Sequence, residues 1–242
     1  MNKSLFQGLT TTEISNLREI LTLRQETYPA KNIIPFSDLK SNTIGIINTG
    51  LVELISRDSD GRDIVLSYFI KEDSFGPFAG DLFEMITEED PYEGNYLLVR
   101  KSADITFLNY EELLTDRPKY QEICKKIIQN LIRIRLMDNR ARILILSRRS
   151  IRERFMTFLE ILWSDKEQND PKRLLQGSTF LSAEASPSAA QPILVALPFS
   201  YTDLAGYLIV DRSALMREIR NMKDEGLIAE EDQKLRLLWK ED

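Results

Sequence analysis

The apolar pattern between residues 119 and 146 is the feature that most constrains the fold of this chain. One set of residues follows alternating steps of four and three, the spacing of a long amphipathic helix. Its members are Ile123, Ile127, Asn130, Ile134, Met137, Ala141 and Leu144. A second set widens the apolar surface beyond one face: Ile128, Leu131, Ile132, Leu136, Ile143 and Ile145. A helix with two apolar faces needs two partners.

We therefore predict a helix that packs on its own chain with one face and on a second copy with the other. The predicted dimer seam consists of Ile123, Ile127, Ile134, Met137 and Ala141. The alternative is a helix buried wholly in the core of one chain. The chain offers no second long amphipathic helix that could cover it, which favours the dimer.

Before this helix the chain is rich in β-prone segments. A short helix is expected over residues 12–21, with Thr10, Thr11 and Thr12 as candidate caps. Short strands are then predicted at residues 43–47, 51–55, 64–69, 96–99 and 104–108. Turn signals at residues 48–50 and 59–61 separate them. This spacing favours a compact antiparallel barrel or sandwich.

Two residue types are missing or nearly so, and their absence excludes several function classes. The chain has no histidine and one cysteine, Cys124. Histidine-dependent catalysis, a His-ligated zinc or haem, and a multi-thiolate iron–sulfur site are therefore excluded, and no metal or other cofactor is expected. The opening residues lack the apolar run of a signal peptide, and no segment is apolar enough to span a bilayer, so a cytoplasmic protein without a membrane partner is expected.

Charge is distributed unevenly along the chain, whose formal net charge is −6. It amounts to −9 for residues 1–118, +8 for 119–154, −2 for 155–192 and −3 for 193–242. The acidic first part argues against a protein that wraps nucleic acid over its whole surface.

Residues 197–219 carry the pattern of a helix-turn-helix. A first helix of about eight residues turns Leu204, Ala205 and Leu208 inward, and the small Ala205 permits a close helix crossing. Asp211 is placed to cap a second helix, whose inward residues are Leu215, Ile219 and Met222.

The second helix exposes Arg212, Ser213 and Arg217 near its start, where side chains can enter a major groove. Arg148 and Arg149, between the two long helical patterns, are predicted to clamp a phosphate at a helix N-terminus. The alternatives are a packed helical subdomain with solvated arginines, and a solvated hinge.

With these features in this order, the chain resembles the Crp/Fnr family of bacterial transcription regulators over essentially its whole length. Four segments carry the resemblance: residues 5–9, residues 48–54 with 60–62, residues 203–219, and residues 223–228. The resemblance implies an α+β fold in three parts. These are a sensor domain of double-stranded β-helix or jelly-roll type (1–118), a dimerisation helix (119–146) and a winged helix-turn-helix domain (147–242).

The resemblance implies a homodimeric regulator, not an enzyme, that binds an inverted repeat in double-stranded DNA, with RNA polymerase as a candidate partner. The implied DNA contacts are Arg212, Ser213, Ala214, Arg217, Ser200, Tyr201, Arg148 and Arg149. The alternative is a ligand-sensing or protein-interaction module that keeps a degenerate winged helix.

The chain departs from the family pattern at two places. Ile209 stands where the family usually has the glycine of the helix-turn-helix turn, and a β-branched residue resists a positive φ. Glu93 stands roughly where cyclic-nucleotide members carry a phosphate-binding arginine. Cyclic AMP is therefore not expected as the effector, and neither is an iron–sulfur cluster or haem, so the effector is unknown.

Aromatic residues could instead line a pocket for an apolar ligand, for which we name Phe75, Phe78, Asp81, Tyr92 and Tyr96. The alternative is that these aromatics fill the interior of the barrel. Cys124 is either a redox sensor or an inert packing residue, and its apolar neighbours favour the second.

Overall fold

The computed structural model describes residues 4–17, 19–35, 39, 42–57, 60–61, 63–76, 95–166, 193–198, 200–231 and 234–237. The chain is divided into two compact units. The first consists of residues 3–136, and the second consists of residues 137–242 with the first two residues. The division lies within the long helix α4 (Gln121–Leu146), whereas the sequence placed boundaries at its two ends. No helix of the described part is long and apolar enough to cross a membrane.

The first unit begins with a short helix, α1 (Thr11–Leu17). Thr10 caps it: its Oγ1 accepts from the backbone N–H of Glu13, and the Glu13 carboxylate accepts from the N–H of Thr10 at 2.7 Å. This is a capping box. The predicted helix over 12–21 is too long, because the chain forms a turn after Leu17. Leu21 is buried, but it follows this turn and is not part of the helix.

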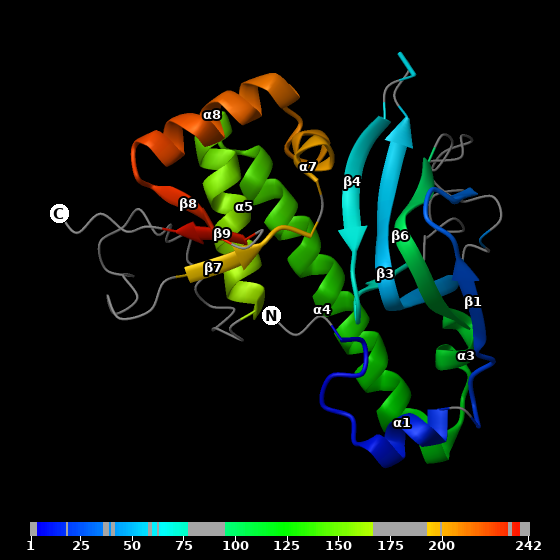
Figure 1. Cartoon of the computed structure of the whole chain (residues 1–242). Coiled ribbons are helices and arrows are strands. Elements are labelled where there is room, and N and C mark those ends of the chain that lie inside the picture. Colours follow the sequence, from blue (N-terminus) through cyan, green and yellow to red (C-terminus); the bar gives the residue numbers. More distant parts are fainter. Residues whose placement is uncertain are drawn as a thin grey trace. The chain divides into compact units, whose positions relative to one another are not determined.

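An antiparallel sheet forms the body of the first unit (Figure 1). Two long strands, β3 (Thr43–Arg57) and β6 (Asn95–Asn109), pair along most of their length. The order β1-β6-β3-β4 is completed by β1 (Arg24–Tyr28) and β4 (Asp63–Phe69), while β2 (Ile33–Pro35) pairs with β6 and β5 (Ser74–Phe75) with β3.

The predicted turn at residues 48–50 is wrong, because β3 runs through it as one strand. Its register against β6 shifts between Ile47 and Val52, and Gly50 has φ +98° at this irregularity. A side chain at Gly50 would meet the backbone of Ser102, so a close strand approach explains the glycine. The predicted strands 96–99 and 104–108 likewise belong to one strand, β6.

Two apolar clusters hold the first unit together. One lies against the sheet and includes Phe69, Phe75, Leu97, Val99 and Phe107. The other joins the N-terminal segment and the sheet to α4, through Cys124, Ile127 and Leu131. Before α4, the chain forms the short helix α3 (Tyr110–Leu114) and a turn of 3₁₀-helix at Pro118–Tyr120.

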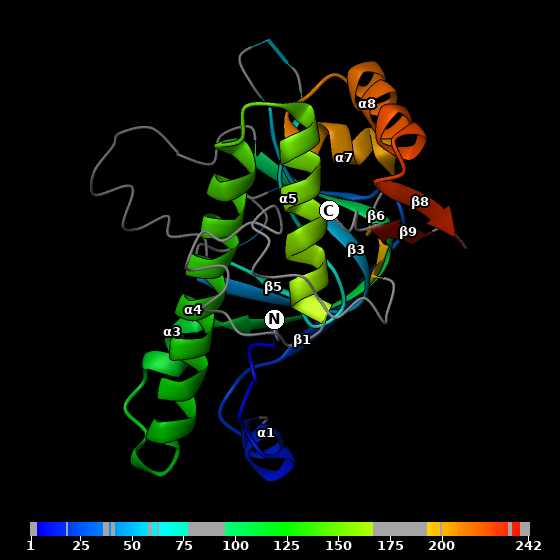
Figure 2. The same ribbon diagram turned by 90° about the vertical axis from the view of Figure 1, so that its left-hand side faces the viewer.

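The described part of the second unit contains, besides the end of α4, three helices and a small antiparallel sheet (Figure 2). They are α5 (Ile151–Lys166), α7 (Tyr201–Leu208) and α8 (Arg212–Asp224). The sheet has the order β7-β9-β8, from β7 (Ile193–Ala196), β8 (Ile228–Glu231) and β9 (Lys234–Leu237). On α5, the residues Phe155, Phe158, Leu159 and Leu162 are buried. The structure is thus α+β, with a larger antiparallel sheet, a long helix and a small C-terminal sheet.

Candidate nucleic-acid interface

Both helices of the predicted helix-turn-helix begin at side-chain caps. Ser200 caps α7, its Oγ accepting from the N–H of Asp203 at 3.3 Å. Asp211 caps α8 by accepting from the N–H of Ala214 at 2.9 Å. The residues predicted to face inward, Leu204, Ala205 and Leu208 on α7 and Leu215, Ile219 and Met222 on α8, are all buried. The cap at Asp211 and both helices are confirmed.

The outer side of α8 carries a basic stripe. Ser213, Arg217 and Arg220 are exposed at spacings of four and three, which puts them on one face of the helix. Arg212 is exposed in the first turn, and Ala214 beside it is half-buried. Tyr201, at the start of α7, is half-buried, and burial raises the pKa of its hydroxyl. The stripe therefore offers guanidinium groups and a hydroxyl without an acidic side chain between them.

Two acidic residues near this stripe, Glu218 of α8 and Glu225 directly after it, form ion pairs within the unit, whereas Asp224 is exposed in the last turn of α8. Arg152 of α5 bonds Glu218 at 2.5 Å and both carboxylate oxygens of Glu225 at 2.7 Å. These bonds, first to Glu225 and then to Glu218, raise the pKa of Arg152. Lys223 pairs with Glu230 in the same way. Around Ser213, Arg217 and Arg220 the outer face of α8 is therefore more basic than the net negative charge of residues 193–242 indicates, and Asp224 stands in line with them at the end of the helix.

The predicted phosphate clamp at the start of α5 is not supported, because that helix end is already capped. The Glu153 carboxylate accepts from the backbone N–H groups of Arg149 and Ser150, both at 3.0 Å, and these bonds lower its pKa. Arg148 is half-buried, and its Nε donates to Thr157 at 3.1 Å. A phosphate there would have to displace Glu153, so only the exposed side chain of Arg149 stays a candidate contact.

The turn between α7 and α8 contains an isoleucine in the left-handed region. Ile209 has φ 52° and ψ 58°. Its N–H donates to Gly206 O and that of Val210 to Ala205 O, which is the Schellman arrangement of a helix end. The substitution of the family's glycine therefore leaves the turn conformation in place.

The outer face of α4 is apolar, but it is not the face that we predicted for the dimer seam. Ile127 and Ile134 are 0% and 2% exposed within one chain, and Ile123 packs against the same cluster as Ile127. Met137 and Ala141 are half-buried. Ile127 and Ile134 cannot meet a second copy, so their assignment to the seam is wrong.

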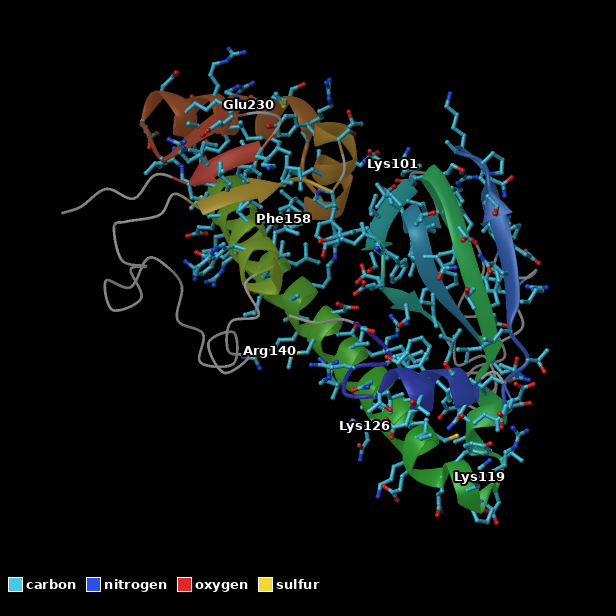
Figure 3. The ribbon with its side chains drawn as sticks, turned by 60° about the horizontal axis from the view of Figure 1, so that its bottom comes forward. Lys101, Lys119, Lys126, Arg140, Phe158 and Glu230 are labelled. Atoms are coloured by element: carbon cyan, nitrogen blue, oxygen red, sulfur yellow. The ribbon has the colours of Figure 1, made fainter. Side chains whose placement is uncertain are left out.

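A different set of residues leaves an apolar stripe uncovered on α4. Ile132, Leu136 and Ile143 are 54%, 65% and 66% exposed, and half-buried Ile128 and Leu146 extend the stripe at both ends. The helix thus has two apolar faces, as predicted, but the exposed face consists of part of the second set, whose other members Leu131 and Ile145 are buried. Basic residues of this segment, such as Lys126 and Arg140 (Figure 3), also lie on α4.

The ligand candidates within the described part do not share a cavity. Phe75 is fully buried and packs on the rings of Phe69 and Phe107, with centroids 5.5 and 6.1 Å away. Tyr96 alternates with Leu97 along β6 and so faces the other side of the sheet. Its hydroxyl accepts from Arg57 at 3.4 Å.

Phe75 is therefore a core residue, and its assignment to a ligand pocket is wrong. Phe78, Asp81 and Tyr92 lie outside the described residues. Within the described part, no group of three or more acidic or cysteine side chains is placed to hold a metal.

Cys124 is a packing residue of α4. It is 4% exposed in the cluster with Ile127, and burial raises the pKa of its thiol. Because the thiolate is the reactive form, we expect iodoacetamide to label the folded protein at neutral pH at least about tenfold more slowly than the unfolded protein. Mass spectrometry of timed samples with and without urea measures both rates, and equal rates would contradict the assignment.

Four arginines of this interface were not found from the sequence. Arg220 follows Ser213 by seven residues, so helical spacing alone could have found it. Arg142, Arg152 and Arg154 act on α7 and α8 from distant positions in the chain, and no local pattern announces them.

Comparison with known proteins gives matches in structure only. No protein-family profile and no curated protein sequence matches the chain. A double mutant of CooA from Carboxydothermus hydrogenoformans has a TM-score of 0.63 at 15% identity, covering 98% of this chain and 92% of that one. The c-di-GMP-responsive global regulator CLP of Xanthomonas campestris has a TM-score of 0.57 at 19% identity, covering 96% and 100%. A CRP-family transcriptional regulator of Thermus thermophilus has a TM-score of 0.55 at 21% identity, covering 88% and 91%.

Proposed function

We propose that this chain, which has the fold of the CRP/FNR-family regulators, is a DNA-binding transcription regulator that acts as a homodimer. The structural neighbours are transcriptional regulators rather than enzymes. The observation that carries the proposal is the basic stripe of α8, in which Ser213, Arg217 and Arg220 are exposed on one face of the helix. Arg152 binds Glu218 and Glu225, and exposed Asp224 lies at the C-terminal end of the stripe. As a regulator that binds chromosomal DNA, the protein would act in the cytoplasm.

The dimer would form through the outer stripe of α4, from Ile128 to Leu146. Ile132, Leu136, Asn139, Ile143 and Leu146 follow one another at alternating steps of four and three, as in a two-stranded coiled coil, and Ile128 precedes them by one further step of four. Exposed Asn139 would fix the register, as single polar residues do in such seams. A two-fold axis would place the two recognition helices about one DNA turn apart, roughly 34 Å, over an inverted repeat.

A ligand-sensing or protein-interaction module that does not bind DNA remains the alternative function. Its support in the sequence was Ile209 and an acidic C-terminal domain. The Schellman bonds at Ile209 and the ion pairs of Arg152 remove much of that support. Cyclic AMP and cyclic GMP remain unexpected as effectors, because the chain lacks the phosphate-binding arginine of the family.

Replacing Arg217 by alanine tests whether α8 is the helix that reads the bases. We expect a loss of about 1–3 kcal/mol in binding free energy and a relaxed preference at one position in each half-site, because an arginine can bind guanine O6 and N7 together. Selection from random duplexes followed by sequencing, at two salt concentrations, measures both effects.

Arg149→Ala is the matched control, since it removes one exposed arginine outside α8. It is expected to weaken all sequences alike and to lower the salt slope by about one unit. Unchanged affinity and preference for Arg217→Ala would show that α8 does not read the bases. Failure to select any sequence with the unaltered protein would favour the alternative function.

A further inference from the structure

We propose that Arg142 and Arg154 are positioning residues that hold the turn between α7 and α8 in its left-handed form, in place of the missing glycine. The effect of these arginines on DNA binding rests on the proposed function, whereas their effect on the conformation of the turn does not.

Ile209 needs such support because its own chemistry opposes its conformation. A β-branched side chain in the left-handed region crowds the backbone, an arrangement that persists only where surrounding contacts enforce it. The side chain of Ile209 is 50% exposed, so its packing contributes little to holding it there. The enforcing contacts must therefore act on the backbone of the turn.

The carbonyl groups of the turn show which contacts these are. The Schellman bonds occupy the carbonyls of Ala205 and Gly206, and two arginines bind the carbonyls of the next three residues. Arg142 donates to Tyr207 O. Arg154 Nη1 donates to Leu208 O at 3.1 Å and to Ile209 O at 3.2 Å. The direction of these last two carbonyls relative to each other is set by the φ and ψ angles of Ile209. A guanidinium that binds both carbonyls therefore favours the left-handed conformation directly.

Each arginine is itself fixed by a second contact. The guanidinium of Arg142 lies 4.3 Å from the centroid of the Tyr207 ring, and burial lowers its pKa. The Tyr207 ring also packs on Phe158 of α5, labelled in Figure 3, at 5.6 Å. Arg154 Nε donates to Arg148 O at 3.1 Å. The turn is thereby attached to the last part of α4 by Arg142 and to α5 by Arg154.

The turn matters for function because α8 begins three residues after Ile209, at Arg212. A turn that relaxes out of the left-handed region would swing the basic stripe of α8 away from its direction. Arg142 and Arg154 would thus act on DNA affinity through Ile209, without a contact to DNA.

The test is a cycle of substitutions in the full-length protein. Arg154→Met keeps the apolar stem and removes the fork, and it is expected to weaken binding to the selected DNA site about tenfold or more. Ile209→Gly alone should stay within about threefold of the unaltered protein, since glycine adopts this conformation readily. The double variant Arg154→Met, Ile209→Gly should bind the selected DNA site within about threefold of the affinity of the unaltered protein. Val210→Gly is the matched control: Val210 does not have a positive φ, so this glycine should not rescue.

Amide exchange in the absence of DNA gives a second readout. The N–H of Val210, bonded to Ala205 O, should exchange about tenfold faster in Arg154→Met and return toward its original rate when Ile209→Gly is added. Unchanged exchange in Arg154→Met, or equal rescue by the two glycine variants, would overturn the proposal. If the unaltered protein binds no DNA, the proposed function fails, while amide exchange still decides the role of Arg154.

Discussion

Replacing both Ile132 and Leu136 by aspartate is expected to convert a dimer into folded monomers. The two side chains are 54% and 65% exposed in one chain, so the charges cost little in the monomer. In a symmetric seam each substitution would bury an unpaired carboxylate on both helices. Each such burial costs several kcal/mol, so dimerisation should weaken by at least about a thousandfold. Light scattering over a range of concentrations measures the mass.

Two further variants make this prediction specific to the outer stripe. Lys126→Asp adds a charge at an exposed position roughly 120° round α4 from Ile132, and the dimer should survive it. Ile127→Asp places a charge in the core of the first unit and should unfold that unit, seen as a loss of far-ultraviolet ellipticity. A mass of one chain for the unaltered protein at all concentrations would contradict the dimer.

Replacing Phe75 by alanine is expected to lower the free energy of unfolding by about 3–5 kcal/mol. The ring is fully buried between Phe69 and Phe107, and it lies directly over Gly45. Its removal would leave a cavity that the paired strands cannot easily close. Because natural domains are stable by only about 5–15 kcal/mol, the midpoint of urea unfolding should fall clearly.

Gly45 supplies the control for this prediction. A Cβ at Gly45 would lie under 3.0 Å from three atoms of the Phe75 ring, so Gly45→Ala alone should cost about 1–3 kcal/mol. In the Phe75→Ala protein the added methyl would enter the space of the lost ring. The two losses should therefore be non-additive by about 1 kcal/mol or more. A loss below about 1 kcal/mol for Phe75→Ala would contradict a core role.

Predictions from local chemistry succeeded where the signal is local. The cap at Asp211 and the inward residues of α7 and α8 follow from spacing and side-chain hydrogen bonding, and the structure has them. For α1 the sequence offered three threonines as caps, and Thr10 is the one that the structure uses. The strand prediction was wrong at Asn48-Thr49-Gly50, because the same residue types, with a glycine, occur both in turns and in strand bulges.

Long-range packing decided what the sequence left open. Periodicity showed two apolar faces on α4, but nothing in the spacing says which face its own unit covers. The structure settles it through Cys124, Ile127 and Leu131, which pack on the N-terminal segment and the sheet. In the same way, the acidic composition of residues 193–242 concealed the ion pairs that Arg152 makes from α5. Both features depend on residues distant in the chain.

The apolar stripe of α4 has a consequence for how such a regulator would respond to its own synthesis. If the chains meet only along this stripe, the dimer is in equilibrium with monomers, and below the dissociation constant the dimer concentration follows the square of the chain concentration. Doubling the chain would then raise occupancy of a weakly filled inverted repeat about fourfold. The rate of translation and degradation would by itself set a steep threshold for transcription, with no small molecule involved.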